Sequence, residues 1–302
     1  MKAEKTILAI VIAIFGQILF SSKLELPKFQ KKIELRTHPI ENIFNKPNIS
    51  KKIKREDNFE KVLVLRVDFQ EDEDPNTTGN GKFDLRDSSV YPVSIGAPPH
   101  DGKYFEETLK SVNYYYKAAS LGFYDLDISV YPTNDSLAYT LPNEMGYYNP
   151  VGASQELMIS RFEEYFTNVF EEADKDSSIT FSDYSHYMIV HAGSEYQHDV
   201  YGDTPSDIPS FFIRVGDGKE VIVDDGYSIS YACNIPETIS QDGNYGVINA
   251  VAAHEFGHSL GFADLYNTFN NRPMVGVFDI MDSGGFGGLG IQGTYSDTIY
   301  YL

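Results

Sequence analysis

Residues 246–266 read GVINAVAAHEFGHSLGFADLY, an apolar run that carries two histidines four positions apart. Positions i and i+4 lie on one face of an α-helix, so His254 and His258 can each direct a ring nitrogen to the same point. The segment 246–261 is apolar nearly all round, which is typical of a helix at the centre of a domain. The sequence therefore predicts a central metal-binding helix.

The residues that follow extend this pattern to HExxHxxGxxD. Glu255 flanks the histidines, where a base for a zinc-activated water must sit. Gly261 can end the helix in the left-handed conformation, after which the chain can bring Asp264 back to the same metal. His254, His258 and Asp264 would leave the fourth position of a tetrahedral zinc ion open, as in catalytic sites.

An ordinary buried helix with two hydrogen-bonded histidines is the alternative interpretation of this motif. Two imidazoles on an apolar helix need polar partners, and a metal ion supplies them. Further along, GVFDIMDSGG at 276–285 places Met281 in a turn-like setting of Asp and Gly, as the methionine turn beneath a metzincin zinc requires. Both features favour the metal site.

The rest of the chain predicts a single α/β (α+β) domain with a mixed, twisted sheet. Apolar or alternating runs predict strands, and apolar residues near helical spacing predict helices. The expected strands are 61–69, 124–132 and 187–193, and the expected helices before the motif are 103–119 and 155–173. His191 is expected in the core and His198 on the surface, and Cys233 as a small buried residue.

Residues 1–22 and 23–58 have a different composition from this domain. The first segment has two lysines before an apolar stretch and predicts a signal peptide; an uncleaved anchor is the alternative. Residues 23–58 are basic and rich in proline, and predict either a removable prosegment or a disordered linker. The catalytic domain would then span 59–302, secreted and without membrane insertion once the leader is removed.

Charge and cysteine usage exclude several classes. The net charge is −20, and residues 59–302 hold 12 Lys and Arg against 38 Asp and Glu. Such an acidic body argues against a nucleic-acid partner, because phosphate binding needs clustered basic residues. One cysteine allows no intrachain disulfide and no cysteine-based zinc ribbon.

Two loops are candidate calcium sites. The loop 72–84, DEDPNTTGNGKFD, has the oxygen ligands to hold Ca²⁺ as a second metal, although a solvated loop is the simpler interpretation. The segment from Asp174, DKDSSITFSDYS, lacks the glycine and the closing glutamate of an EF-hand, so it predicts a turn.

The sequence resembles the immune inhibitor A type of secreted zinc metallopeptidases, a metzincin-like branch of the HExxH peptidases. VLVLRVDFQ, the segment 98–132, MIVHAGSEYQ, AHEFGHSLGFADLYNT and VFDIMDSGG stand in the order that this family uses. The resemblance implies a zincin fold, zinc on His254, His258 and Asp264, Glu255 as general base and Met281 as the turn methionine. An aspartate as third ligand fits this family.

The expected function is a secreted zinc endopeptidase that cleaves protein or peptide substrates. The chain ends soon after the expected methionine turn, whereas such proteins usually continue, so the sequence also predicts a C-terminally truncated domain. The alternative is an inactive surface or binding domain that keeps the fold. A hydrolase of other amides or esters is a third possibility.

Overall fold

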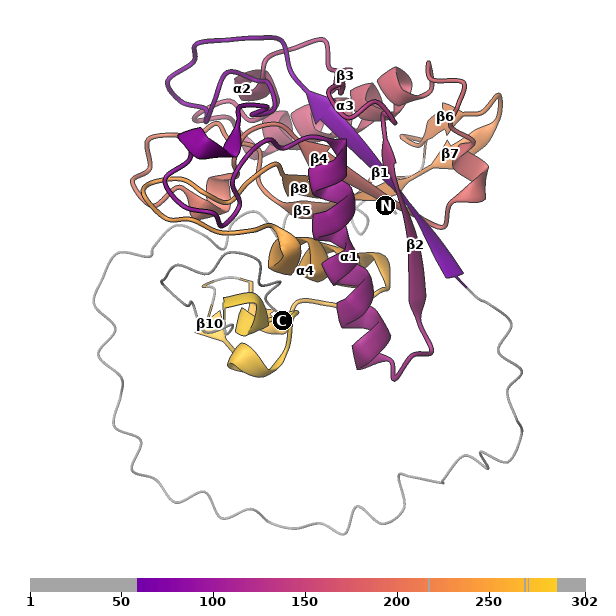
Figure 1. The fold of residues 1–302 in the computed structure, drawn as a ribbon. Helices are drawn as coiled ribbons and strands as arrows, with labels where there is room; N and C mark the ends of the chain where they lie inside the picture. Colours follow the sequence, from indigo (N-terminus) through magenta and orange to yellow (C-terminus); the bar gives the residue numbers. More distant parts are fainter. Residues whose placement is uncertain (1–58, 217, 269, 271, 287–302) are drawn as a thin grey trace, which may run out of the picture. The chain divides into compact units, whose positions relative to one another are not determined.

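The structure, a computed structural model, describes residues 59–216, 218–268, 270 and 272–286. Within these residues a mixed sheet has the strand order β2-β1-β4-β8-β5, and β3 pairs with the end of β1 (Figure 1). Its strands are β1 (Phe59–Asp68), β2 (Asp125–Tyr131), β3 (Tyr139–Thr140), β4 (His186–His191), β5 (Phe211–Arg214) and β8 (Tyr231–Pro236). The described helices are α1 (Gly102–Ala119), α2 (Met145–Tyr148), α3 (Gln155–Ala173) and α4 (Asn249–Ser259).

All strands of this sheet are parallel except β5, which runs antiparallel to β8 at one edge. The register pairs Val64 of β1 with Met188 of β4, and Met188 with Cys233 of β8. Parallel strands need crossover connections, and α1 supplies the one between β1 and β2. This mixed α/β arrangement agrees with the expected fold class.

Helices cover both faces of the sheet because the side chains of β1 alternate between them. Leu63 and Leu65 belong to the hydrophobic cluster that contains α3. Val62 and Val64 belong to the cluster that contains α1 and α4. Figure 1 accordingly shows α1 and α4 on one side of the sheet and α3 on the other.

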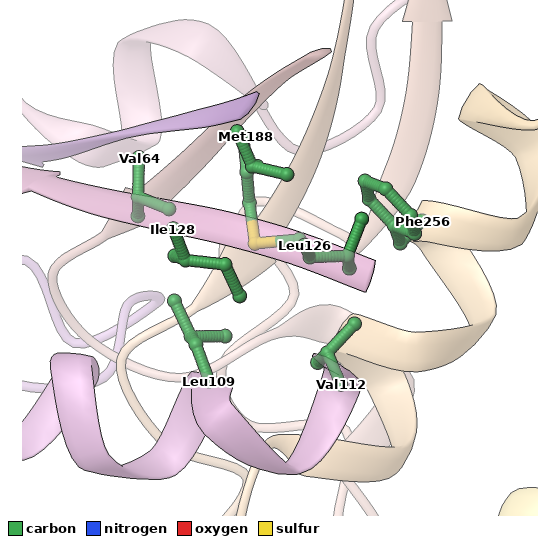
Figure 2. A pocket seen from close by; sticks show the side chains of 8 residues that line it. Val64, Leu109, Val112, Leu126, Ile128, Met188 and Phe256 are labelled. Carbon is green, nitrogen blue, oxygen red and sulfur yellow. The ribbon is translucent and has the colours of Figure 1, made fainter. Parts of the chain in front are cut away.

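The layer between α1 and the sheet is apolar and tightly filled. Figure 2 shows Leu109 and Val112 of α1 facing side chains of three strands, with Phe256 of α4 beside them. The strand residues in this view are Val64, Leu126, Ile128 and Met188. Together with Val62, the side chains of this layer leave no room for a water molecule. Such packing holds α4 at a fixed depth below the sheet.

Short elements complete the described part of the chain. Two hairpins are formed by β6 (Val221–Val223) with β7 (Tyr227–Ile229), and by β9 (Tyr266–Asn267) with β10 (Arg272–Pro273). Single 3₁₀ turns lie at Ser88–Val90, Phe181–Asp183, Tyr196–His198, Gly276–Phe278 and Ser283–Phe286. The last two turns flank Met281.

The strands and helices predicted before residue 200 are all present, with boundaries shifted by two residues or fewer. The predicted helix 246–261 is shorter, because α4 begins at Asn249 and ends at Ser259. The expected leader 1–22 and basic segment 23–58 lie outside the described residues. No helix among the described residues combines the length and the apolar character that crossing a bilayer requires.

Candidate metal centre

The motif helix α4 is held by its own apolar residues. Ala252, Ala253 and Phe256 are buried in the cluster that α4 shares with α1 and the sheet. The helix ends where Gly261 takes a φ of +90°, a left-handed conformation that favours glycine. The N–H of Phe262 then donates to the carbonyl of Gly257 at 3.0 Å, so the chain turns back beside the helix. Gly261 thus has the role that the sequence predicted.

The turn brings the three predicted ligands together. Oδ1 of Asp264 lies 3.2 Å from Nε2 of His254 and 3.3 Å from Nε2 of His258. The three side chains offer ligand atoms that lie within 4.8 Å of one another. All three residues are half-buried, so the cluster faces a partly open space.

These spacings fit one zinc ion. Atoms bound at about 2.0 to 2.1 Å to a tetrahedral zinc ion lie about 3.3 to 3.4 Å from each other. Oδ1 of Asp264 is buried and accepts no hydrogen bond, although both Nε2 atoms are close to it. A set of two imidazoles and one carboxylate suits zinc, whereas calcium prefers oxygen ligands alone. The residues present therefore fit the metal that the sequence predicted.

Backbone carbonyls fix both imidazole rings. Nδ1 of His254 lies 2.8 Å from the carbonyl oxygen of Ile280, and Nδ1 of His258 lies 2.9 Å from that of Phe262. A carbonyl only accepts hydrogen bonds, so each Nδ1 carries a proton. When a bound cation displaces the other proton, the neutral ring presents its lone pair at Nε2, the atom that faces Asp264.

Glu255 is buried beside this cluster and lacks a partner. The residue is 7% exposed, and Oε2 has no hydrogen bond. Burial raises the pKa of Glu255 to about 7; Asp264 and Glu195 add to the rise, and the two histidines of the motif oppose it. A carboxylate whose pKa lies near neutrality can both accept and return a proton at physiological pH.

The electrostatics of the cluster favour positive charge. Burial lowers the pKa of His254, but contact with Asp264 and the charge of Glu255 outweigh it and raise the value to about 9. The pKa of His258 is raised by the same balance. Burial opposes ionisation of Asp264, yet the two histidines hold its pKa well below the usual range. The buried carboxylate of Glu255 and the half-buried carboxylate of Asp264 thus create a negative potential that a cation would neutralise.

Met281 lies directly against the motif helix. It is 3% exposed, and a Cβ placed on Gly257 would lie 2.5 Å from its sulfur. Gly257 stands between the two histidines, so the thioether packs under the middle of the motif. The carbonyl of Met281 also accepts the N–H of Leu265 at 2.8 Å, which ties the segment after the helix to this turn.

Two neighbours of the cluster, and a buried carboxylate next to Met281 in the chain, were not identified from the sequence. The ring of Tyr266 stacks near His254, with centroids 6.3 Å apart, and Phe212 of β5 lies 6.1 Å from the ring of His258. Asp282 is buried, and its Oδ2 accepts the N–H groups of Met274, Val275 and Gly276 at 2.7 to 2.8 Å. Only Tyr266 had a local signal, since it follows Asp264 by two positions.

The remaining histidines and the cysteine differ in environment. His191 is fully buried, with Nδ1 3.0 Å from the carbonyl of Ala192, and Cys233 is fully buried, as predicted. His198 was predicted on the surface but is half-buried, because its Nδ1 contacts the carboxylate of Glu195. Glu195 is itself buried and also accepts a hydrogen bond from Ser210.

The loop 72–84, the candidate calcium site, uses its carboxylates in local hydrogen bonds. Oδ1 of Asp72 accepts the N–H of Asp74, and Oδ1 of Asp74 accepts the N–H of Asn76, both at 2.9 Å. Among the described residues, the other group of three metal-ligand side chains is Asp199, Asp203 and Asp242, which is partly exposed. Calcium binding by the loop 72–84 stays an untested alternative to a solvated loop.

No protein-family model matches the chain, and a search of curated protein sequences found no significant match.

Proposed function

We propose that this protein is a metzincin-like zinc endopeptidase, in which His254, His258 and Asp264 hold the metal and Glu255 is the general base. The observation that carries the proposal is the convergence of both Nε2 atoms on Oδ1 of Asp264, at the spacing of ligands around one ion. The unpartnered, buried oxygen of Glu255 beside them supplies the base.

Each residue has a defined task in this proposal. Zinc bound here would supply Lewis acidity, polarising the scissile carbonyl and making a water acidic enough to attack. Glu255 accepts the proton of the attacking water and returns it to the leaving amine, which suits a carboxyl whose pKa is about 7. The carbonyls of Ile280 and Phe262 keep both imidazole rings in the tautomer that offers Nε2.

Peptide is the proposed substrate, because three protein ligands beside a carboxylate base suit amide hydrolysis and the motif resembles that of secreted peptidases. We also propose that the protein acts outside the cell, on the basis of its leader-like first residues. The acidic body between 59 and 302 makes nucleic acid an unsuitable partner.

The test is hydrolysis of labelled casein by the full chain, with chelator, with zinc restored and with Glu255→Gln. The substituted amide keeps the size of the side chain and removes the base, so zinc content should stay near one equivalent while turnover falls about 10²-fold or more. A zinc-loaded wild-type protein that cuts no peptide would contradict the proposal and favour a binding domain. Zinc content unchanged in Asp264→Ala would contradict the ligand assignment.

A further inference from the structure

A second pair of buried ionisable groups, His100 and Glu237, lies outside the metal centre. Both side chains are 3% exposed, and Nδ1 of His100 lies 2.7 Å from Oε1 of Glu237. The other ring nitrogen, Nε2, lies 3.0 Å from the carbonyl oxygen of Gly96. Glu237 also accepts the N–H of Asp84 at 2.6 Å and that of Gly193 at 2.8 Å.

His100 needs both of its ring protons in this environment. A carboxylate and a carbonyl are acceptors, so each ring nitrogen must donate, and only the imidazolium has two donors. A neutral ring would turn one lone pair toward an acceptor that is buried and has no water to replace the lost bond. Leaving a buried acceptor unsatisfied is costly.

The pair joins two segments that meet next to α4. Glu237 follows β8 and begins the segment 237–248 that leads into α4, here called the lead-in. His100 ends the segment 84–100. The backbones of these segments approach closely, because a Cβ on Gly96 would lie 2.4 Å from the carbonyl oxygen of Gly246. The rings of Tyr91 and Tyr245 also make an edge contact, with centroids 5.6 Å apart.

The start of α4 depends on this lead-in. The residue at its N-cap, Ile248, makes no side-chain capping hydrogen bond and is instead buried in the core. Within the first turn the side chain of Asn249 accepts the N–H of Ala250 at 3.0 Å, so tertiary packing and this bond fix the start of the helix in place of an N-cap side chain. Whatever holds the segment 237–248 therefore also positions the helix that carries His254 and His258.

We propose that His100 and Glu237 form a proton-dependent latch, which fixes the segment 84–100 against the lead-in to α4 and opens when His100 loses its proton. The latch concerns how α4 is held and does not depend on whether the protein hydrolyses peptides. It would set the alkaline limit of an ordered metal centre.

The other groups around His100 do not supply a competing switch. The ring of Tyr104 contacts that of His100 at a tilt, with centroids 4.6 Å apart, and burial raises the pKa of the Tyr104 hydroxyl, so it stays neutral. The second carboxylate that acts on His100 is Asp84, whose charge is paired with Arg86 at 2.7 Å. Burial lowers the pKa of His100, but hydrogen bonding to Glu237 and the charges of Glu237 and Asp84 outweigh it, so the pKa is raised.

The test is an NMR pH titration of the full chain with labelled histidine and labelled backbone amides. His100 should titrate above the ordinary value of about 6.5, whereas His186, whose pKa is lowered mainly by burial, should titrate below it. The amide shifts of Asp84 and Gly193 should follow the His100 titration, because both N–H groups donate to Glu237. Hydrogen-exchange protection in 84–100 and 237–248 should fall about tenfold or more across the same pH range, after correction for intrinsic exchange.

The variant His100→Phe keeps a flat ring and removes both donors, so its two segments should exchange fast at every pH. Zinc affinity should also fall in this variant. Titration of His100 at or below 6.5, or Asp84 and Gly193 amides that do not follow it, would overturn the latch. That result needs no folded variant and leaves the zinc assignment untouched.

Discussion

Replacing Gly257 by alanine tests how the motif helix is packed. A Cβ at this position would lie 2.5 Å from the sulfur of Met281 and 2.9 Å from the hydroxyl oxygen of Tyr116. Neither neighbour can move freely, since Met281 is 3% exposed and the hydroxyl of Tyr116 donates to the carbonyl of Ala253 at 2.6 Å. The helical backbone of Gly257 would accept alanine, but the two neighbouring atoms obstruct its methyl group.

Two opposing effects set the size of the change. Alanine is favoured over glycine inside a helix by about 1 kcal/mol. Overpacking a filled core costs about 1 to 3 kcal/mol, and two obstructing atoms place this site toward the upper half of that range. We expect Gly257→Ala to lower the free energy of unfolding by about 1 to 2 kcal/mol.

The assay is urea unfolding of the wild type, both single variants and the double variant Gly257→Ala/Met281→Ala. Met281→Ala alone should cost about 2 to 5 kcal/mol by leaving a cavity. In that background the new methyl group fills part of the space, so Gly257→Ala should be less destabilising by about 1 kcal/mol or more. Equal costs in both backgrounds, or a Gly257→Ala protein more stable than the wild type, would refute the packing of Met281 under the motif.

Three further predictions concern single residues. Asp264→Ala should weaken zinc binding as strongly as His258→Ala, measured by competition with a chromogenic chelator, because each removes one of three ligands. Burial lowers the pKa of His191 to about 4, so as the pH falls the unfolded chain binds a proton before the folded chain does. The free energy of unfolding should therefore fall by about 3 kcal/mol between pH 6.5 and pH 4, and His191→Gln should flatten that part of the plot of unfolding free energy against pH. Asp282→Ala removes the acceptor of the N–H groups of residues 274–276. Amide exchange of these three residues should therefore accelerate, while that of the sheet core stays slow.

Continuous apolar runs and helical periodicity made much of the fold predictable. The run around Val64 is buried on both faces of the sheet, and the helices at 103–119 and 155–173 each have an apolar stripe. The strands β5 and β8 were not anticipated. β8 contains Asn234 and ends at Pro236, and its place is set by pairing with β4, which no local pattern encodes.

The candidate site likewise has a part that the local sequence predicts and a part that it does not. Its ligands lie within eleven residues, so helical spacing and one glycine are enough to indicate that His254, His258 and Asp264 converge. The groups that orient them are distant in sequence. Ile280 lies 26 positions beyond His254 in the sequence. The identity of the Ile280 side chain gives no indication that its backbone carbonyl faces an imidazole.

This division has a physical consequence for the proposed metal centre. A short helix with two histidines can attract zinc by itself, but the rings would rotate freely and the cost of ordering them would fall on the binding step. Here the carbonyls of Ile280 and Phe262 hold the rings. The sulfhydryl of Cys233, on β8, donates to the carbonyl of Glu255 at 3.1 Å. β8 and the segments that carry Ile280 and Phe262 therefore convert a local motif into a preorganised one, which is what the proposed catalytic site requires.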